Sequence, residues 1–299
     1  MDTALILKIE HRKGLISDYE SAKHFLEQSD LLRQLLAENF QFESYQLMNR
    51  LNEIAEIPFT QYIPKVQEWL AILNSLTACD EGFSLTKKKD YILSCYNGML
   101  TSLFIRMEYS NHKEIHQGIN WITKYQRFER NTPTEWNGSG ILRYGGCLKA
   151  IPCYIGIVKS IIALSEYKKS IYYQSNQIVE SKFNQGIDYI LNQNVYLRKS
   201  TSEPITNYIT SLSYPFTWKT NVIEILRMLK SNGFVNDSRC NFAMEYLKSK
   251  QKDNGIWYAN AGYKPKGWIL FDKPKESSLW ISQEIQEILE ISNNNCPLE

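Results

Sequence analysis

The chain has no long uninterrupted apolar run of the kind that crosses a membrane. Its most apolar later stretch, 144–164, is interrupted by two lysines and a proline, which is wrong for a bilayer span of roughly 20 residues. The apolar run at 4–7 is short and is followed at once by charged residues, so residues 1–14 are not expected to be a signal peptide. We therefore expect a cytoplasmic protein with no transmembrane segment, for which peripheral contact with a membrane stays open.

An excess of one charge is also lacking. The chain has 34 Lys and Arg against 32 Asp and Glu, a net charge of +2, whereas a nucleic-acid-binding protein gathers basic residues on one face. We therefore expect no nucleic-acid partner. Its six cysteines form no short disulfide framework, which favours reduced thiols.

Aromatic residues, in contrast, make up 13% of the chain, and most apolar residues recur at spacings of three and four. That spacing indicates amphipathic helices, and strand signals are scarce. By area scaling, a chain of this mass buries roughly three quarters of its surface. The sequence predicts an all-α fold with a large core, in which Ser29 caps a helix that contains Leu31 and Leu32.

The chain contains an internal repeat. Four predicted helix starts are separated by 58, 65 and 62 residues, and they lie at Cys95, Cys153, Trp218 and Trp280. At offsets of four, five, eight and nine from these anchors, fourteen of sixteen positions are apolar. Each helix therefore presents one apolar face, and the four are equivalent packing units.

A second set of helices alternates with the first. Each member has an aromatic anchor followed five positions later by a side-chain amide: Trp69 and Asn74, Trp121 and Gln126, Tyr189 and Asn194, Tyr246 and Gln251. An amide where a helix ends can satisfy backbone groups of that helix and of the next one, so we expect it to be first a structural device. Two copies, 121–136 and 246–257, also end in Trp.

The residues Gln251, Gly255 and Trp257 resemble the glutamine–tryptophan repeat of squalene cyclases. The alternating helix pairs, with a period of about 60 residues over 63–289, resemble the α/α toroid shared by terpenoid cyclases and protein prenyltransferase β subunits. The segments that begin at Cys95 and Cys147 are similar to short bacterial and archaeal proteins of the prenyltransferase-like or squalene-cyclase-like kind.

This resemblance implies a barrel of alternating inner and outer helices over 63–299, capped by an N-terminal helical segment at 1–62. The inner helices would begin at the four repeat anchors and surround a central cavity. That cavity would bind an isoprenoid or a similarly hydrophobic small molecule, whose contacts would come from Cys95, Cys153, Tyr154, Tyr214, Trp218 and Trp280. Aromatic faces can clasp such a chain or stabilise a cation.

The catalytic signatures of these families are missing. Neither the DxDD motif of the cyclases nor the DDxxD motif of ionising synthases occurs, and the pair Asp80–Glu81 is expected to cap a helix. The prenyltransferase zinc site needs a late histidine, whereas all four histidines lie at or before residue 116. His112 and His116 are expected on a solvated helix face, and Cys147 and Cys153 as packed thiols.

We therefore expect no metal and no cofactor, and the catalytic residues stay unknown. Whether the chain is an enzyme stays open; if it is, a prenyltransferase- or cyclase-like transferase or isomerase is the expected class.

The segment 271–280 resembles a DKPxK stretch of prenyltransferase relatives that leads into an inner helix. The resemblance implies that Lys273 and Lys275 contact phosphate groups, together with the positive end of the helix at Trp280. The alternative is an exposed basic loop.

Two other functions stay open. A carbohydrate-active α/α barrel needs two facing carboxylates, for which Asp90 and Glu224 are the candidates, but Glu224 lies beside the apolar stripe of its helix. The other alternative is a non-catalytic scaffold that binds a peptide or protein.

Overall fold

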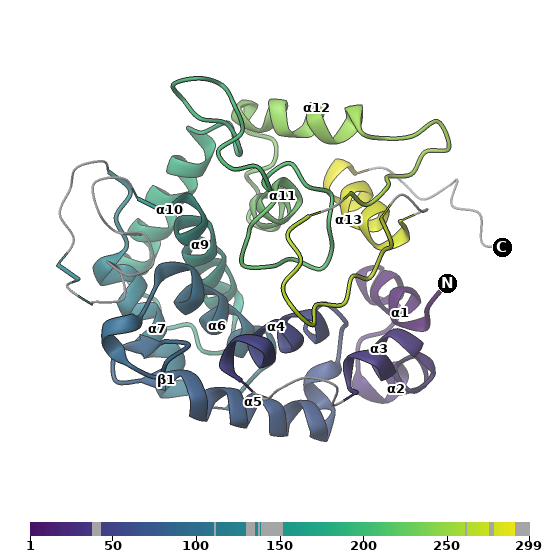
Figure 1. Cartoon of the computed structure of the whole chain (residues 1–299), viewed down its shortest axis with the longest axis horizontal. Coiled ribbons are helices and arrows are strands. Elements are labelled where there is room, and N and C mark those ends of the chain that lie inside the picture. The colour runs from purple at the N-terminus through teal and green to yellow at the C-terminus, as the bar shows by residue number, and fades with distance from the viewer. Residues whose placement is uncertain are drawn as a thin grey trace. The chain divides into compact units, whose positions relative to one another are not determined.

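A computed structural model describes residues 1–37, 43–110, 112–129, 135–136, 138, 152–260, 262–274 and 278–290. Within these residues the chain is mostly helical (Figure 1), which confirms the predicted all-α class. The strands described are two residues each and form one antiparallel hairpin, β1 (Ala78–Cys79) with β2 (Gly82–Phe83).

The α-helices before the middle of the chain are α1 (Thr3–Arg12), α2 (Tyr19–Gln28), α3 (Asp30–Leu35), α4 (Ser44–Ile54), α5 (Pro64–Thr77), α6 (Ser94–Arg106) and α7 (His112–Tyr125). Those that follow are α9 (Tyr154–Lys169), α10 (Gln177–Leu191), α11 (Val222–Ser231), α12 (Asn241–Ser249) and α13 (Leu279–Leu289). Short 3-10 turns lie at Thr60–Tyr62, Lys89–Tyr91 and Ser238–Cys240.

The chain forms two compact units. Unit 1 comprises Met1–Gly186 with Pro265–Ile269, and unit 2 comprises Ile187–Lys264 with the described part of Leu270–Glu299. In unit 1, α4 packs on α5 and α6, so the N-terminal helices share a unit with the repeat helices of that region. The division predicted between residues 62 and 63 stays a prediction.

Local capping explains where several helices begin. Ser29 Oγ accepts the backbone N–H of Leu32 at 2.9 Å, which confirms the predicted cap of α3. Asp2 caps α1 by accepting from the N–H of Ala4 and also accepts from Ser29 Oγ and the N–H of Leu31. One carboxylate thus joins the starts of α1 and α3.

The prediction that Asp80 and Glu81 cap a helix is wrong, because these residues form the turn of the β-hairpin. The turn is held by Asn97 of α6, whose Oδ1 accepts the N–H of Phe83 at 2.9 Å while its Nδ2 donates to Gly118 O of α7 at 3.0 Å. Gly82 lies in the left-handed region (φ +150°), and a Cβ there would lie 2.7 Å from Asn97 Oδ1. The contact of Asn97 with Phe83 thus stabilises a hairpin turn at Asp80 and Glu81, where their acidic side chains alone suggested a helix cap.

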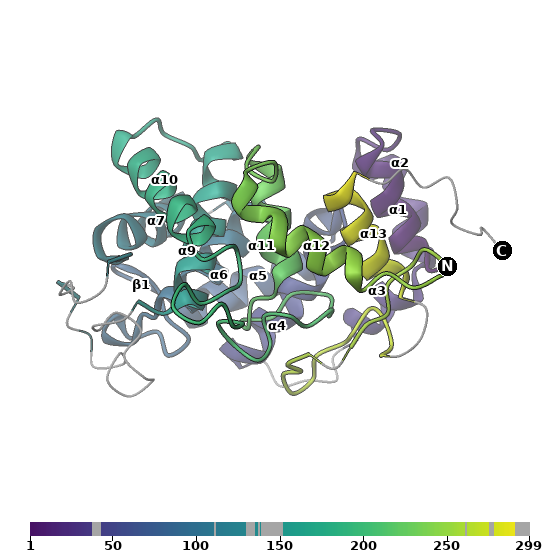
Figure 2. The same cartoon turned by 90° about the horizontal axis from the view of Figure 1, so that it is seen from above.

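The predicted inner helices α6 and α9 pack against each other, and they lie side by side in both views (Figures 1 and 2). A Cβ on Gly98 would lie 2.6 Å from the backbone carbonyl of Lys159, and a Cβ on Gly156 would lie 2.8 Å from Ser94 Cβ. Ser94 of α6 thus faces Gly156 of α9, and Gly98 faces Lys159 one turn later. Because the order is the same on both helices, α6 and α9 run parallel. Glycine permits this close backbone approach.

In unit 2, the predicted inner helices α11 and α13 also pack on each other. Arg227 Nη1 lies 3.6 Å from Glu284 Oε2, and one turn later Lys230 Nζ donates to Glu287 O and lies 3.7 Å from Glu290 Oε1. Because these contacts advance in the same direction on both helices, α11 and α13 run parallel as well.

The amide of Gln251 has a structural role, but in the loop after α12 and not at a helix end. Its Nε2 donates to Gly255 O at 2.8 Å, and the indole N–H of Trp257 donates to Leu247 O at the end of α12 at 2.7 Å. The backbone N–H of Trp257 then donates to Ser282 Oγ of α13 at 3.0 Å. The motif therefore closes α12 and connects it to α13.

The second copy uses the same parts. The side chain of Gln126 is buried, accepts from Ser160 Oγ of α9 at 3.2 Å and donates to Arg127 O at 2.8 Å. Trp136 packs on Trp121 of α7, with ring centroids 5.5 Å apart. The amide thus connects the end of α7 to α9, and the second Trp packs back on α7, whereas the predicted contacts of the amide with helix-end backbone groups are not made among the residues that the structure describes.

Three of the four predicted inner-helix starts agree with the structure to within one residue, but the start at Trp218 is wrong, because α11 begins at Val222. Asn221 is its cap and accepts the N–H of Glu224 at 3.0 Å. Before it, Thr217 Oγ1 accepts the N–H of Lys219 and holds this segment as a turn.

In the part of the chain that the structure describes, no helix has both the length and the apolar character needed to cross a bilayer.

Candidate functional site

Four aromatic side chains of unit 2, Tyr214, Phe216, Phe271 and Trp280, form what we call the aromatic cluster. The rings of Tyr214 and Trp280 are stacked, with centroids 5.8 Å apart and planes at 18°. Phe271 lies 5.5 Å from Tyr214 and 4.8 Å from Trp280, and Phe216 lies 5.2 Å from Tyr214. Two residues predicted for the cavity, Tyr214 and Trp280, are therefore brought together across 66 positions of sequence.

Asp272 positions this cluster. Its carboxylate accepts the N–H groups of Trp280 at 3.1 Å and Ile281 at 2.8 Å, and the N–H of Phe271 donates to Tyr214 O at 3.3 Å. Asp272 is only 6% exposed, and burial raises the pKa of its carboxyl group to about 6, against the lowering effect of the backbone N–H groups. The N–H groups at the start of α13, which the resemblance predicted to bind a phosphate, are therefore hydrogen-bonded to the carboxylate of Asp272.

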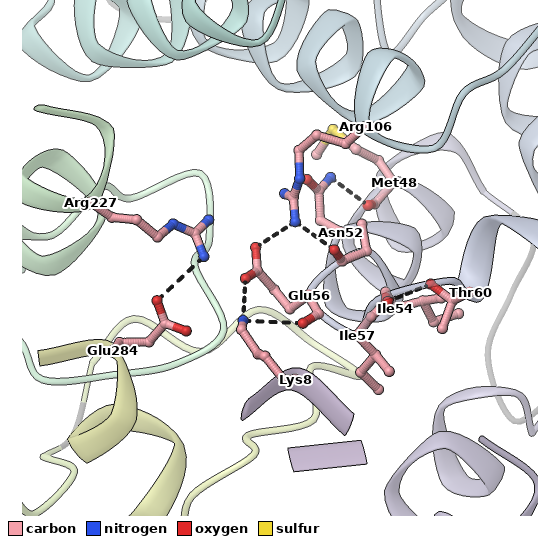
Figure 3. Close-up of polar contacts among 11 residues, drawn as sticks. Lys8, Met48, Asn52, Ile54, Glu56, Ile57, Thr60, Arg106, Arg227 and Glu284 are labelled. Carbon is pink, nitrogen blue, oxygen red and sulfur yellow. Dashed lines mark hydrogen bonds and ion pairs between the residues drawn. The ribbon is translucent and has the colours of Figure 1, made fainter. Parts of the chain in front are cut away.

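A cation borders the aromatic cluster. The guanidinium of Arg227 lies over the ring of Phe216, 4.5 Å from its centroid. It also pairs with Glu284, as Figure 3 shows. The side chain of Glu284 is 1% exposed, whereas that of Arg227 is 30% exposed. Unit 2 therefore combines aromatic faces with a partly accessible guanidinium.

The other predicted contacts of unit 2 have different positions. Trp218 lies in the turn before α11 and packs on Tyr263, with ring centroids 5.6 Å apart. Lys273 is exposed in the loop before α13, and Lys275 lies outside the described residues. Sequence reasoning missed Phe271 as a contact, although this residue opens the stretch 271–280 from which the phosphate contacts were predicted.

Cys95, Cys153 and Tyr154 belong to unit 1, where they lie at the starts of α6 and α9. Burial, with a smaller contribution from the neighbouring Cys153, raises the pKa of the Cys95 thiol to about 12. Cys95 is therefore a buried thiol that is protonated at neutral pH. That all six predicted residues line one cavity stays a prediction.

The histidines of α7 pack on tyrosines. His112 lies 4.8 Å from the ring of Tyr172, and His116 Nδ1 is 3.2 Å from the hydroxyl of Tyr167. Burial, with a smaller contribution from His112, lowers the pKa of His116. Across the described ranges, His, Cys, Asp and Glu side chains form no group of three or more that could hold a metal ion.

The carboxylates proposed for a carbohydrate-active site have separate surroundings. Glu224 is buried near the start of α11, where its Oε2 accepts from Thr220 Oγ1 at 2.7 Å. Asp90 is exposed in a 3-10 turn of unit 1. The hydrogen bond from Thr220 gives Glu224 a local structural role at the start of its helix.

A buried ionic network in unit 1 was not predicted from the sequence. Glu56 accepts from Lys8 Nζ at 3.3 Å and from Arg106 Nη2 at 2.9 Å, as Figure 3 shows. Lys8 Nζ also donates to Glu56 O at 3.1 Å, and Arg106 donates to Ala55 O at 2.5 Å. The network joins α1, the end of α4 and α6. The one sequence signal for it is Lys8 directly after the apolar run at 4–7.

The candidate site is therefore the aromatic cluster with its polar neighbours. Tyr214 and Trp280 belong to the predicted set, and Phe216, Phe271, Asp272 and Arg227 lie beside them. Compared with known proteins, the chain matches no family model, no curated protein and no solved structure.

Proposed function

We propose that the chain is a divergent α/α toroid of the terpenoid cyclase and prenyltransferase kind, and that its aromatic cluster binds the apolar chain of an isoprenoid-like ligand. The contacts among Tyr214, Phe216, Phe271 and Trp280 carry this proposal. No catalytic step is part of it, because the acids and zinc ligands of the related chemistries are missing from the sequence.

The helix pairs support the toroid. Successive inner helices of such a barrel are parallel neighbours, since each is preceded by an outer helix that returns the chain to the same end. The parallel packing of α6 on α9 and of α11 on α13 agrees with this arrangement. The connection from α12 through Trp257 to α13 agrees with an outer helix leading into an inner one.

The chemistry of the aromatic cluster supports an apolar ligand. Flat π-faces favour contact with the methyl groups and double bonds of an isoprenoid chain. Phe271 is the partly exposed ring of the cluster, and Tyr214, Phe216 and Trp280 are buried behind it. Asp272 occupies the N–H groups at the start of α13, so we expect a diphosphate to add little at that helix end. Recognition should therefore depend chiefly on the hydrocarbon part of the ligand.

The proposal is tested by thermal unfolding with geranylgeraniol and with geranylgeranyl diphosphate. At a ligand concentration of about 100 times Kd, binding adds about 2.7 kcal/mol, which raises Tm by roughly 5 °C for a chain of this size. We expect both compounds to raise Tm, and the alcohol to be nearly as effective as the diphosphate.

Phe271→Leu should reduce this shift at least threefold, because it removes one aromatic face but keeps an apolar side chain. The matched control is Phe183→Leu, the same substitution at a buried position of α10 in unit 1, which should leave the shift unchanged. Equal shifts for the two variants would separate binding from the aromatic cluster, and the absence of any shift with either compound would exclude the ligand class.

A further inference from the structure

Three aromatic residues of unit 2 surround the ammonium group of Lys219, and we call this arrangement the lysine box. Lys219 Nζ lies 4.3 Å from the ring centroid of Trp218, 5.3 Å from that of Tyr208 and 6.0 Å from that of Tyr263. The rings also contact one another edge to face, with Tyr263 5.6 Å from Trp218 and 5.7 Å from Tyr208. The lysine box is a built arrangement of three rings around one cation.

The backbone holds the lysine box in place. Thr217 Oγ1 accepts the N–H of Lys219 at 3.1 Å and donates to Lys219 O at 3.2 Å. Tyr208 is fixed through its carbonyl oxygen, which accepts from Ser211 N at 3.0 Å and from Ser211 Oγ at 2.7 Å. The backbone at Tyr208 and on both sides of Trp218 is therefore held by hydrogen bonds that do not involve the ammonium of Lys219.

The lysine ammonium is a poor fit for its surroundings. Within the part of the chain that the structure describes, no carboxylate pairs with Lys219, so its ordered contacts are ring faces. A primary ammonium is strongly hydrated and favours hydrogen-bond acceptors, which ring faces replace only in part. It also lies close to Trp218 and farther from the two tyrosines, so the lysine box is wider than the group it holds.

A quaternary ammonium group suits the same space better. It donates no hydrogen bond, is weakly hydrated and is broad enough to touch several rings at once, which is why aromatic cages recognise choline and methylated lysine. Tyr208 is 37% exposed, and Trp218, Lys219 and Tyr263 are each partly exposed, so a small ligand has access. The stem of Lys219 is flexible and can move its ammonium into water.

We infer that the lysine box is a binding site for a trimethylammonium group of the choline type, and that Lys219 is its built-in competitor. A ligand binds when its cation replaces the lysine ammonium over Trp218, Tyr208 and Tyr263. This inference concerns a different set of residues from the aromatic cluster and does not rest on the proposed function.

The test is a titration of the full chain with choline, followed by saturation-transfer NMR of the methyl protons and by calorimetry. Lys219→Ala should bind choline with a Kd about tenfold lower than the unsubstituted chain, because it removes the internal cation. The matched control is Lys250→Ala, which removes an exposed lysine that lies over a single ring, Tyr246, at 5.2 Å, and should leave the Kd unchanged.

Charge and ring are tested separately. The neutral isostere 3,3-dimethylbutan-1-ol, which has the shape of choline without its charge, should bind neither the unsubstituted chain nor Lys219→Ala. Adding Trp218→Leu to Lys219→Ala should abolish choline binding, whereas adding Trp218→Phe should keep most of it. Circular dichroism confirms that each variant is folded.

Sedimentation with phosphatidylcholine vesicles, compared with phosphatidylglycerol vesicles, shows whether the trimethylammonium group comes from a lipid head group or from a small molecule. Selective sedimentation of Lys219→Ala with phosphatidylcholine assigns the site to a lipid head group, and binding of free choline alone assigns it to a small molecule. The inference is overturned if folded Lys219→Ala binds choline no better than the unsubstituted chain, or if the neutral isostere binds equally well.

Discussion

The pairs α6–α9 and α11–α13 both run parallel, but different groups hold them together. In unit 1 the backbones meet at Gly98 and Gly156, where no Cβ would fit without movement. In unit 2 the contact is made by long side chains, as in the pair of Arg227 with Glu284. The same spacing of apolar residues therefore does not produce the same contacts between helices. The aromatic cluster lies beside the pair that is joined by side chains, α11 and α13.

The largest loss of stability is expected for Gly98→Leu, which changes the close contact between α6 and α9. The new side chain would begin 2.6 Å from the carbonyl of Lys159, so α6 and α9 must separate. We expect the free energy of unfolding to fall by about 3 kcal/mol, as for overpacked cores, measured by urea denaturation. The exposed substitution Lys113→Ala should cost less than about 0.5 kcal/mol. A similar cost for both variants would contradict the close approach.

The pH dependence of unit 2 should follow from Asp272. Its pKa is raised in the folded state to about 6 from 3.8, so its contribution is present below pH 3.8 and is lost as the pH rises through 6. The loss is up to about 3 kcal/mol in the free energy of unfolding, because one pKa unit corresponds to about 1.4 kcal/mol.

Asp272→Asn keeps one acceptor for α13 but does not ionise. Between pH 4 and 6, denaturation curves of this variant should therefore lack the decrease that is attributed to Asp272. The exposed Asp253→Asn should keep the full decrease. A decrease that persists in Asp272→Asn would assign it to another group.

Arg227→Ala tests how far side chains hold α11 to α13. It removes a cation from the buried carboxylate of Glu284 and from the ring of Phe216. Breaking a buried pair costs 3–5 kcal/mol, but Arg227 is partly exposed, so we expect a cost of about 2 kcal/mol by urea denaturation. Arg227→Lys should recover about half of it. A cost of less than about 0.5 kcal/mol would show that this pair does not hold the helices together.

The smallest expected effect compares two buried tryptophans, Trp257 after α12 and Trp121 in α7. Trp257→Phe removes the hydrogen bond to Leu247 O, whereas Trp121 Nε1 has no hydrogen-bond partner among the residues described. We expect Trp257→Phe to cost about 1.5 kcal/mol and Trp121→Phe to cost less, because it also removes an unpaired buried donor. Equal changes in Tm would mean that the indole hydrogen bond does not matter.

Much of the local structure could be predicted from spacing and capping. The starts of α6, α9 and α13 follow from the repeated apolar face, and Ser29 was identified as a cap. The repeat predicts the start of α11 four residues too early, because the spacing of its apolar face takes no account of the capping residue. The signal was present, since Asn221 followed by Glu224 three positions later is typical of a helix N-terminus.

The candidate site was only partly predictable. Tyr214 and Trp280 were expected near inner-helix starts, but the place of Phe271 beside them depends on a loop held by the carboxylate of Asp272. The partners in the network of Lys8 and Glu56 are 48 positions apart. No local spacing relates residues so distant in the chain.

The sequence by itself determined the helical class, the starts of α6, α9 and α13 and the cap at Ser29, because these depend on neighbours within a few turns. The tertiary structure alone decided that Asp80 and Glu81 form a hairpin turn, that Asp272 occupies the start of α13 and that four aromatic rings meet in unit 2. Such contacts join residues that are distant in the chain, and burial and packing select them only once the helices have assembled.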